Sequence, residues 1–98
     1  MSKSDGRVID QRLVRAVSHP LRVEVLEAIV NEGEISPTLV ATKLQQDLGK
    51  VSYHVGVLKS CEVIELAKTR PRRGALEHFF RPAPSMRGFI ELAKSTFS

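Results

Sequence analysis

The stretch Ser36–Ser60, which reads SPTLVATKLQQDLGKVSYHVGVLKS, decides the fold. It contains two helix-start signals, the pair Ser36-Pro37 and the single residue Asp47. Serine and aspartate favour the position before a helix because their side-chain oxygens accept free backbone N–H groups of the first turn, and proline fits that turn. The sequence therefore predicts helices over 37–44 and 48–60, joined by a turn of three residues.

The second of these helices has two different faces. Its apolar residues recur at spacings of 3, 4 and 3, which is the period of a buried helical stripe: Leu48, Val51, Val55 and Leu58. The opposite side carries small and polar residues together with one valine: Gly49, Lys50, Tyr53, Gly56 and Val57, with Ser52 and His54 on the flanks. One face is suited to packing and the other to contacting a partner.

Further elements are expected on both sides of this stretch. Apolar residues at helical spacing predict helices over 8–17 and 21–30, with Ser18 or His19 as the cap between them and Gly33 as a stop. After Cys61 the pattern becomes extended, which predicts strands over 63–69 and 75–81 around a loop at 70–74. A last helix is expected over 85–97.

Two helices joined by a short turn and followed by a hairpin form the layout of a winged helix-turn-helix. The predicted fold class is mainly α with a small β wing, with about five helices and a two- to three-stranded antiparallel sheet. We expect a flexible N-terminus at 1–7, a DNA-binding domain at 8–82 and a C-terminal helix within 83–98.

Composition narrows the class of protein. The 98 residues suffice for one domain, and 42% hydrophobic with 27% charged residues is typical of a globular chain. The apolar runs are too short for a membrane span, and the polar start of the sequence lacks the apolar core of a signal peptide, so we expect a cytoplasmic protein with no membrane partner. A single cysteine, Cys61, excludes a disulfide within the chain.

The positive charge is concentrated in one segment. Residues 68–81 contain five basic residues and only one acidic residue, Glu77, whereas the residues before them are almost neutral. Such a segment favours a phosphate-bearing partner. We therefore expect double-stranded DNA to bind with helix 48–60 in the major groove and the wing 68–81 on the backbone or in the minor groove. The candidate DNA-binding residues are Gly49, Lys50, Ser52, Tyr53, His54, Lys68, Arg70, Arg72 and Arg73. For His54, a structural hydrogen bond is an equally good alternative.

Three stretches resemble ArsR-like winged helix-turn-helix regulators: Ser18–Arg22 (SHPLR), Val51–Leu58 (VSYHVGVL) and Arg72–Arg81 (RRGALEHFFR). The resemblance covers roughly residues 10–82. It implies a transcriptional regulator, a repressor in this reading, that forms a homodimer through its first and last helices. The corresponding dimerisation residues are Val8, Ile9, Leu13, Met86, Phe89, Ile90, Ala93 and Phe97.

The metal sites of that family do not carry over. Many members bind metal through a cysteine pair on the third helix, but the matching stretch Thr38–Thr42 has no cysteine. Others use aspartate and histidine on the last helix, which here offers only Glu91. We expect no metal and no cofactor, and a small-molecule effector of unidentified chemistry is the remaining candidate ligand.

Two other functions compete with DNA binding. An enzyme needs a nucleophile with a base, a pair of acids or a metal cage, and the three histidines and one cysteine lie in separate predicted elements, so we expect no catalysis. A winged helix that binds only proteins is the stronger rival. Such a module would have no need for the concentrated basic residues of the wing.

Overall fold

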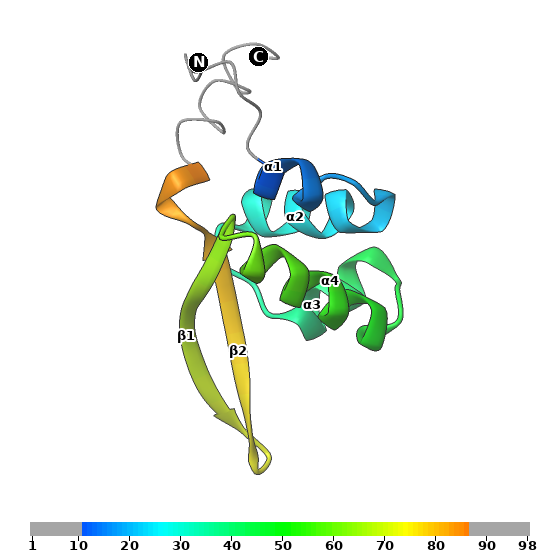
Figure 1. The fold of residues 1–98 in the computed structure, drawn as a ribbon. Coiled ribbons are helices and arrows are strands. Elements are labelled where there is room, and N and C mark those ends of the chain that lie inside the picture. The colour runs from blue at the N-terminus through cyan, green and yellow to red at the C-terminus, as the bar shows by residue number, and fades with distance from the viewer. Residues whose placement is uncertain (1–10, 87–98) are drawn as a thin grey trace, which may run out of the picture.

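The computed structural model describes residues 11–86, which form a helical body with a β-hairpin standing beside it (Figure 1). The elements, in chain order, are α1 (Gln11–Ala16), α2 (Pro20–Glu32), α3 (Pro37–Leu44), α4 (Leu48–Ser60), β1 (Ile64–Arg72), β2 (Ala75–Pro82) and a 3-10 turn (Pro84–Met86). The predicted winged helix-turn-helix is confirmed, with four α-helices in the described part of the chain rather than about five. Most of the helix expected over 85–97 lies outside the described residues, as do the first residues of the helix expected over 8–17.

The helix starts lie where the capping residues predict them. His19 accepts the Leu21 N–H at 3.2 Å through Nδ1 and precedes Pro20. Ser36 Oγ accepts the Leu39 N–H at 3.3 Å, and Asp47 Oδ2 accepts the Lys50 N–H at 3.1 Å. Each side chain satisfies a backbone donor that has no partner within its helix. The three-residue turn between α3 and α4 is closed by Gln45, whose φ of 55° is left-handed.

The core lies between α2, α3 and α4 and the base of the hairpin. Its most deeply buried side chains come from these four parts: Val25, Ile29, Val40, Val51, Leu58 and Ile64. The apolar stripe of α4 is confirmed at Val51, Val55 and Leu58. The prediction is wrong for two residues. Leu48, expected in the buried stripe, lies in the first turn and is 46% exposed, while Val57, expected on the opposite side, is buried. After α4 the chain passes through residues 61–63 into β1, and α4 and β1 are in contact.

The hairpin is longer than its predicted strands. β1 and β2 pair antiparallel from Ile64 opposite Pro82 to Arg72 opposite Ala75, with a bulge between Leu66 and Lys68. The loop expected over 70–74 is shorter in the structure: residues 70–72 belong to β1, and only Arg73 and Gly74 form the turn. Both have positive φ, 50° and 82°, the geometry that matches a two-residue turn to the twist of its strands. Pro71 is tolerated within β1 because this is an edge strand.

A third, one-residue strand completes the sheet. Ile35, between α2 and α3, pairs with Phe80 through backbone hydrogen bonds of 3.0 and 2.9 Å. This bridge attaches the base of the hairpin to the helical body, while the tip extends beyond it (Figure 1). Within residues 11–86, no helix has the length and hydropathy needed to cross a membrane.

Candidate nucleic-acid interface

One face of α4 is directed outward with polar side chains. Lys50, Ser52 and Tyr53 are exposed, Tyr53 to 63%. Among residues 11–86 the Lys50 ammonium has no ion-pair partner. The Asp47 cap and the buried stripe on the opposite side fix this face relative to the core. The face can therefore donate hydrogen bonds from an ammonium and two hydroxyls without first breaking internal contacts.

Gly49, one of the candidate DNA-binding residues, has a structural role at the start of α4. A Cβ atom built on this residue would lie 2.9 Å from Asp47 Oδ2, the atom that caps the helix. Any larger residue would displace the capping carboxylate. The glycine permits the cap, and the cap in turn holds the helix that carries Lys50.

The register of the hairpin places the basic residues on one side of the wing. Directly opposed residues in an antiparallel pair share a face, and neighbours along a strand alternate between faces. Lys68, Arg70 and Arg72 are opposite Phe79, Glu77 and Ala75, so these six residues lie on one face. The other face carries Thr69, Pro71, Leu76 and His78. The three basic residues at alternate positions of β1 thus form one basic surface, and the other face is mostly uncharged.

The wing cations differ in how far they are already neutralised. Lys68 pairs with Glu34 at 2.9 Å, and Arg72 pairs with Glu77 at 3.4 Å. The Arg70 guanidinium lies 5.0 Å from the centre of the buried Phe79 ring, within cation–π distance. Arg73, at the tip, forms no hydrogen bond or ion pair with another residue in the described chain. The tip is therefore the least compensated positive charge of the wing.

His54 is the predicted DNA-binding residue that the structure moves to the interior. Only 5% of it is exposed, and its Nδ1 accepts a hydrogen bond from Arg22 Nε at 3.2 Å. Burial is the main reason why the pKa of His54 lies below its ordinary value, and the charges of His19 and Arg22 lower it further. The structural hydrogen bond is the correct alternative, and His54 is not part of the exposed face.

Arg22 is the site residue that the sequence reasoning missed. It is 7% exposed, and besides His54 it donates from Nη1 to the Arg15 carbonyl at 2.6 Å and to Ser18 Oγ at 3.3 Å. It thereby joins the end of α1, the start of α2 and the middle of α4. The signal was present in the stretch Ser18–Arg22, where an arginine follows a helix start, but only tertiary contacts show that its charge points inward.

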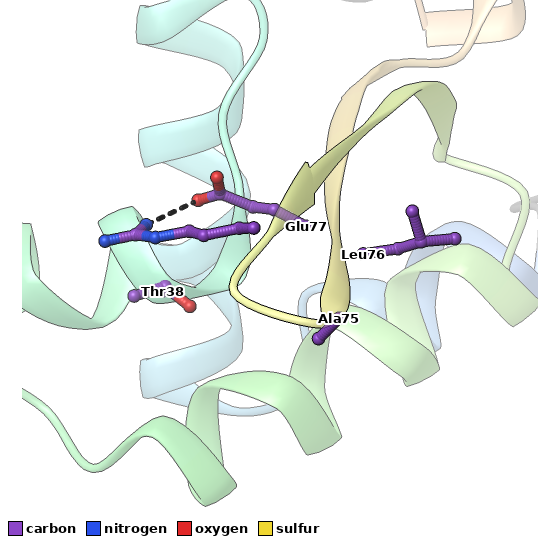
Figure 2. Close-up of a pocket in the computed structure, with 5 residues that line it drawn as sticks. Thr38, Ala75, Leu76 and Glu77 are labelled. Carbon is purple, nitrogen blue, oxygen red and sulfur yellow. Dashed lines mark hydrogen bonds and ion pairs between the residues drawn. The ribbon is translucent and has the colours of Figure 1, made fainter.

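A shallow hollow of about 200 Å³ separates the wing from the start of α3. Figure 2 shows Glu77 reaching from the hairpin to the side where Thr38 lies, while Leu76 points to the opposite side. Arg72, the ion-pair partner of Glu77, also lines this hollow. Glu77 is only 10% exposed and accepts a hydrogen bond from Ser36 Oγ at 2.9 Å. The basic face of the wing is thus the face that borders α3.

The predicted dimerisation residues are only partly within the described chain. Leu13 is half-buried against the core, and Met86 is 5% exposed and packs into the same core. Met86 is therefore a core residue of its own chain, which corrects its assignment to a subunit interface. The remaining ones lie outside the described residues: Val8, Ile9, Phe89, Ile90, Ala93 and Phe97.

Residues 11–86 contain no group of three or more histidine, cysteine or acidic side chains placed to hold a metal ion. Cys61 is a free, buried thiol at the end of α4 and packs as a small apolar residue.

The fold is shared with several solved regulators. HlyU from Vibrio vulnificus, a transcriptional regulator, aligns with a TM-score of 0.64 at 20% identity over 90% of this chain and 86% of its own. NolR from Sinorhizobium fredii aligns at 0.63 and 16% identity over 89% and 82%. The homodimeric winged helix-turn-helix DNA-binding domain Mb0332 from Mycobacterium bovis aligns at 0.62 and 19% identity over 87% and 77%. The sequence itself matches no protein-family model and no curated protein.

Proposed function

We propose that this protein is a transcriptional regulator that binds specific sequences of double-stranded DNA and represses the genes that it controls. The observation that carries the proposal is the presence of two unlike surfaces in one domain. α4 presents Lys50, Ser52 and Tyr53 on a capped and packed helix, and the adjacent hairpin presents the basic residues of the wing. The structural likeness to known regulators supports the same function.

The two surfaces suit the two kinds of contact that specific binding needs. A helix fits the major groove, where lysine can reach guanine edges and hydroxyls can donate to bases or phosphates. A charged ribbon suits the backbone or the minor groove, where it adds affinity with little sequence information. Sequence choice is therefore assigned to α4, and strength of binding to Lys68, Arg70, Arg72 and Arg73.

We also propose that the regulator acts as a homodimer. The spacing of apolar residues in 8–17 and 85–97 predicts two helical stripes, and Mb0332, which has the same fold, is homodimeric. A two-fold axis would direct two copies of α4 toward half-sites about 10 bp apart or a multiple of that spacing.

Selection of bound duplexes from a random library tests this function. The expected result is an enriched motif with two-fold symmetry, bound far more tightly than random DNA at about 0.15 M salt. A protein that enriches no duplex motif contradicts the proposal and favours the rival in which the winged helix binds only proteins. A motif without symmetry retains DNA binding but contradicts the dimer.

A further inference from the structure

The outer part of the wing is attached to the helical body by a single hydrogen bond. At the base, the Ile35–Phe80 bridge and the Lys68–Glu34 ion pair hold the hairpin. Beyond them, the bond from Ser36 Oγ to Glu77 Oε2 is the only hydrogen bond or ion pair, within residues 11–86, that joins segment 69–78 to any other segment. A long two-stranded ribbon is free to bend at its base, so this outermost contact determines where its tip lies.

The contact connects the wing directly to the helix-turn-helix. Ser36 is fully buried, and its hydroxyl accepts the Leu39 N–H at the start of α3 while it donates to Glu77. Both functions of the hydroxyl are therefore in use. The Glu77 carboxylate is nearly buried and also accepts a hydrogen bond from Arg72 at 3.4 Å, which is the dashed line at Glu77 in Figure 2. A chain of hydrogen bonds therefore runs from the α3 backbone through Ser36 and Glu77 to a wing arginine. A buried carboxylate is tolerated here because each contact compensates for its lost hydration.

We propose that Glu77 is a positioning residue for DNA binding: through Ser36 it holds the wing at a fixed angle to α3 and α4, so that the wing arginines meet the same duplex as the recognition helix. This inference rests on the proposed DNA-binding function. The positioning role explains why the basic segment 68–81 contains one acidic side chain, Glu77.

The proposal predicts an unusual direction for the change in DNA affinity. Removing a negative charge from a DNA-binding surface ordinarily raises affinity, because the charge repels phosphates. If Glu77 positions the wing, removing its hydrogen bond lowers affinity instead, although the net charge becomes more favourable. Charge and hydrogen bonding can be separated, since glutamine is neutral but still accepts a bond from a hydroxyl.

The experiment compares Glu77→Ala, Glu77→Gln and the control Glu65→Ala on one duplex that the unmodified protein binds, across a series of salt concentrations. Glu65 is also on a wing strand and pairs with Arg81 at 2.8 Å, but it has no hydrogen bond to the helical body. We expect Glu77→Ala to weaken binding roughly tenfold at 0.15 M salt and to lower the salt slope by about 1–2 units, because arginine–phosphate contacts are lost. Glu77→Gln and Glu65→Ala should bind at least as tightly as the unmodified protein.

The salt slope separates positioning from loss of folded protein, because a smaller folded fraction lowers apparent affinity equally at every salt concentration. Should Glu77→Ala fail to fold, Glu77→Leu fills the volume without accepting a hydrogen bond and takes its place. Equal affinities and slopes for Glu77→Ala and Glu77→Gln would overturn the proposal.

A second measurement needs no DNA. Residual dipolar couplings of the free protein report the orientation of the hairpin relative to α2–α4. We expect the couplings of residues 69–78 to change in Glu77→Ala and to be retained in Glu77→Gln and Glu65→Ala, with the couplings of the helices unchanged throughout. Unchanged wing couplings in Glu77→Ala refute the positioning role even if DNA binding holds. Failure of the unmodified protein to bind any duplex refutes the proposed function, while the couplings still decide whether Ser36 and Glu77 orient the wing.

Discussion

Two adjacent side chains on α4 have opposite environments. Tyr53 is 63% exposed, whereas His54 is 5% exposed, although their rings lie 5.2 Å apart. A rotation of about 100° per residue places one ring in solvent and the other at the edge of the core. What keeps His54 inside is the Arg22 guanidinium, which donates to it and needs a neutral acceptor. Within residues 11–86, Tyr53 has no hydrogen-bond partner of this kind, and its hydroxyl remains available to a ligand.

Exposed residues of α4 are expected to control sequence preference. Lys50→Ala or Tyr53→Ala should cost about 1–3 kcal/mol of binding free energy on the preferred duplex and much less on random DNA, because base contacts are lost. Fluorescence anisotropy with both duplexes measures the difference. Val55→Ala is the control, because this buried residue should instead lower the free energy of unfolding by about 1–3 kcal/mol. Equal losses on the two duplexes would show that Lys50 and Tyr53 contact only phosphates.

The buried His54 predicts a pH dependence of stability. Its pKa in the folded protein lies below the ordinary value of 6.5, first because of burial and then because of His19 and Arg22. As the pH falls below about 6.5, the unfolded chain binds a proton at this histidine before the folded chain does. The free energy of unfolding should therefore be fully retained above this pH and decrease toward the lower folded-state pKa.

Urea unfolding at about pH 7.5 and about pH 5.5 measures this decrease. The control is His54→Asn, because asparagine offers Arg22 an acceptor that does not titrate. We expect the asparagine variant to lose less stability on acidification than the unmodified protein does. The same loss in both proteins would contradict the role assigned to His54.

Among the elements, the arrangement of charge on the wing depends most on how successive side chains alternate between the two faces of its strands. Its two-residue turn, with positive φ at Arg73 and Gly74, fixes the register that places Lys68, Arg70 and Arg72 together. A bulge between Leu66 and Lys68 changes the alternation at the base of β1. On β2, the consecutive residues Phe79 and Phe80 point to different faces, and both are buried. The hairpin thereby packs into the core with Phe80 and presents cations above Phe79.

The wing should provide affinity and not sequence choice. Arg72→Ala combined with Arg73→Ala is expected to weaken binding to all duplexes and to lower the salt slope by about 1–2 units, since phosphate or minor-groove contacts are lost. Arg81→Ala is the matched control, because Arg81 lies at the wing base and is paired with Glu65. Its salt slope should remain that of the unmodified protein. A change in the preferred sequence of the double variant would assign base recognition to the wing.

In the molecule as a whole, the two ends of the described chain meet at one place. Glu62 forms an ion pair with Arg12 of α1, and its carbonyl accepts a hydrogen bond from Ser85 at 3.3 Å. A hollow of about 110 Å³ is lined by residues of α1, of the segment after α4 and of the 3-10 turn. The described part of the chain therefore begins and ends at neighbouring points, which is compatible with the dimer proposed above.

The mass of the protein in solution tests the proposed dimer. Light scattering at micromolar concentration should give about twice the 10.9 kDa of one chain. Phe89→Asp combined with Phe97→Asp should lower this mass to that of a single chain, because carboxylates at an apolar interface lose hydration without gaining partners. Circular dichroism checks that the variant is folded. A single-chain mass for the unmodified protein, or an unchanged mass for the folded variant, would contradict the dimer.

The sequence by itself determined the local structure, that is, where helices begin and which segments are helical or extended. Local signals of this kind act over a few residues, so they can be recognised without a tertiary structure. They are the caps at His19, Ser36 and Asp47, the helical periodicity of Val51, Val55 and Leu58, and the change to extended spacing after Cys61. Only the tertiary structure decided which way several polar side chains point. Arg22 and His54 meet across 32 residues of sequence and Ser36 and Glu77 across 41, and each bond depends on packing between elements. No local pattern contains that information, because burial of a charge depends on the partner that compensates it.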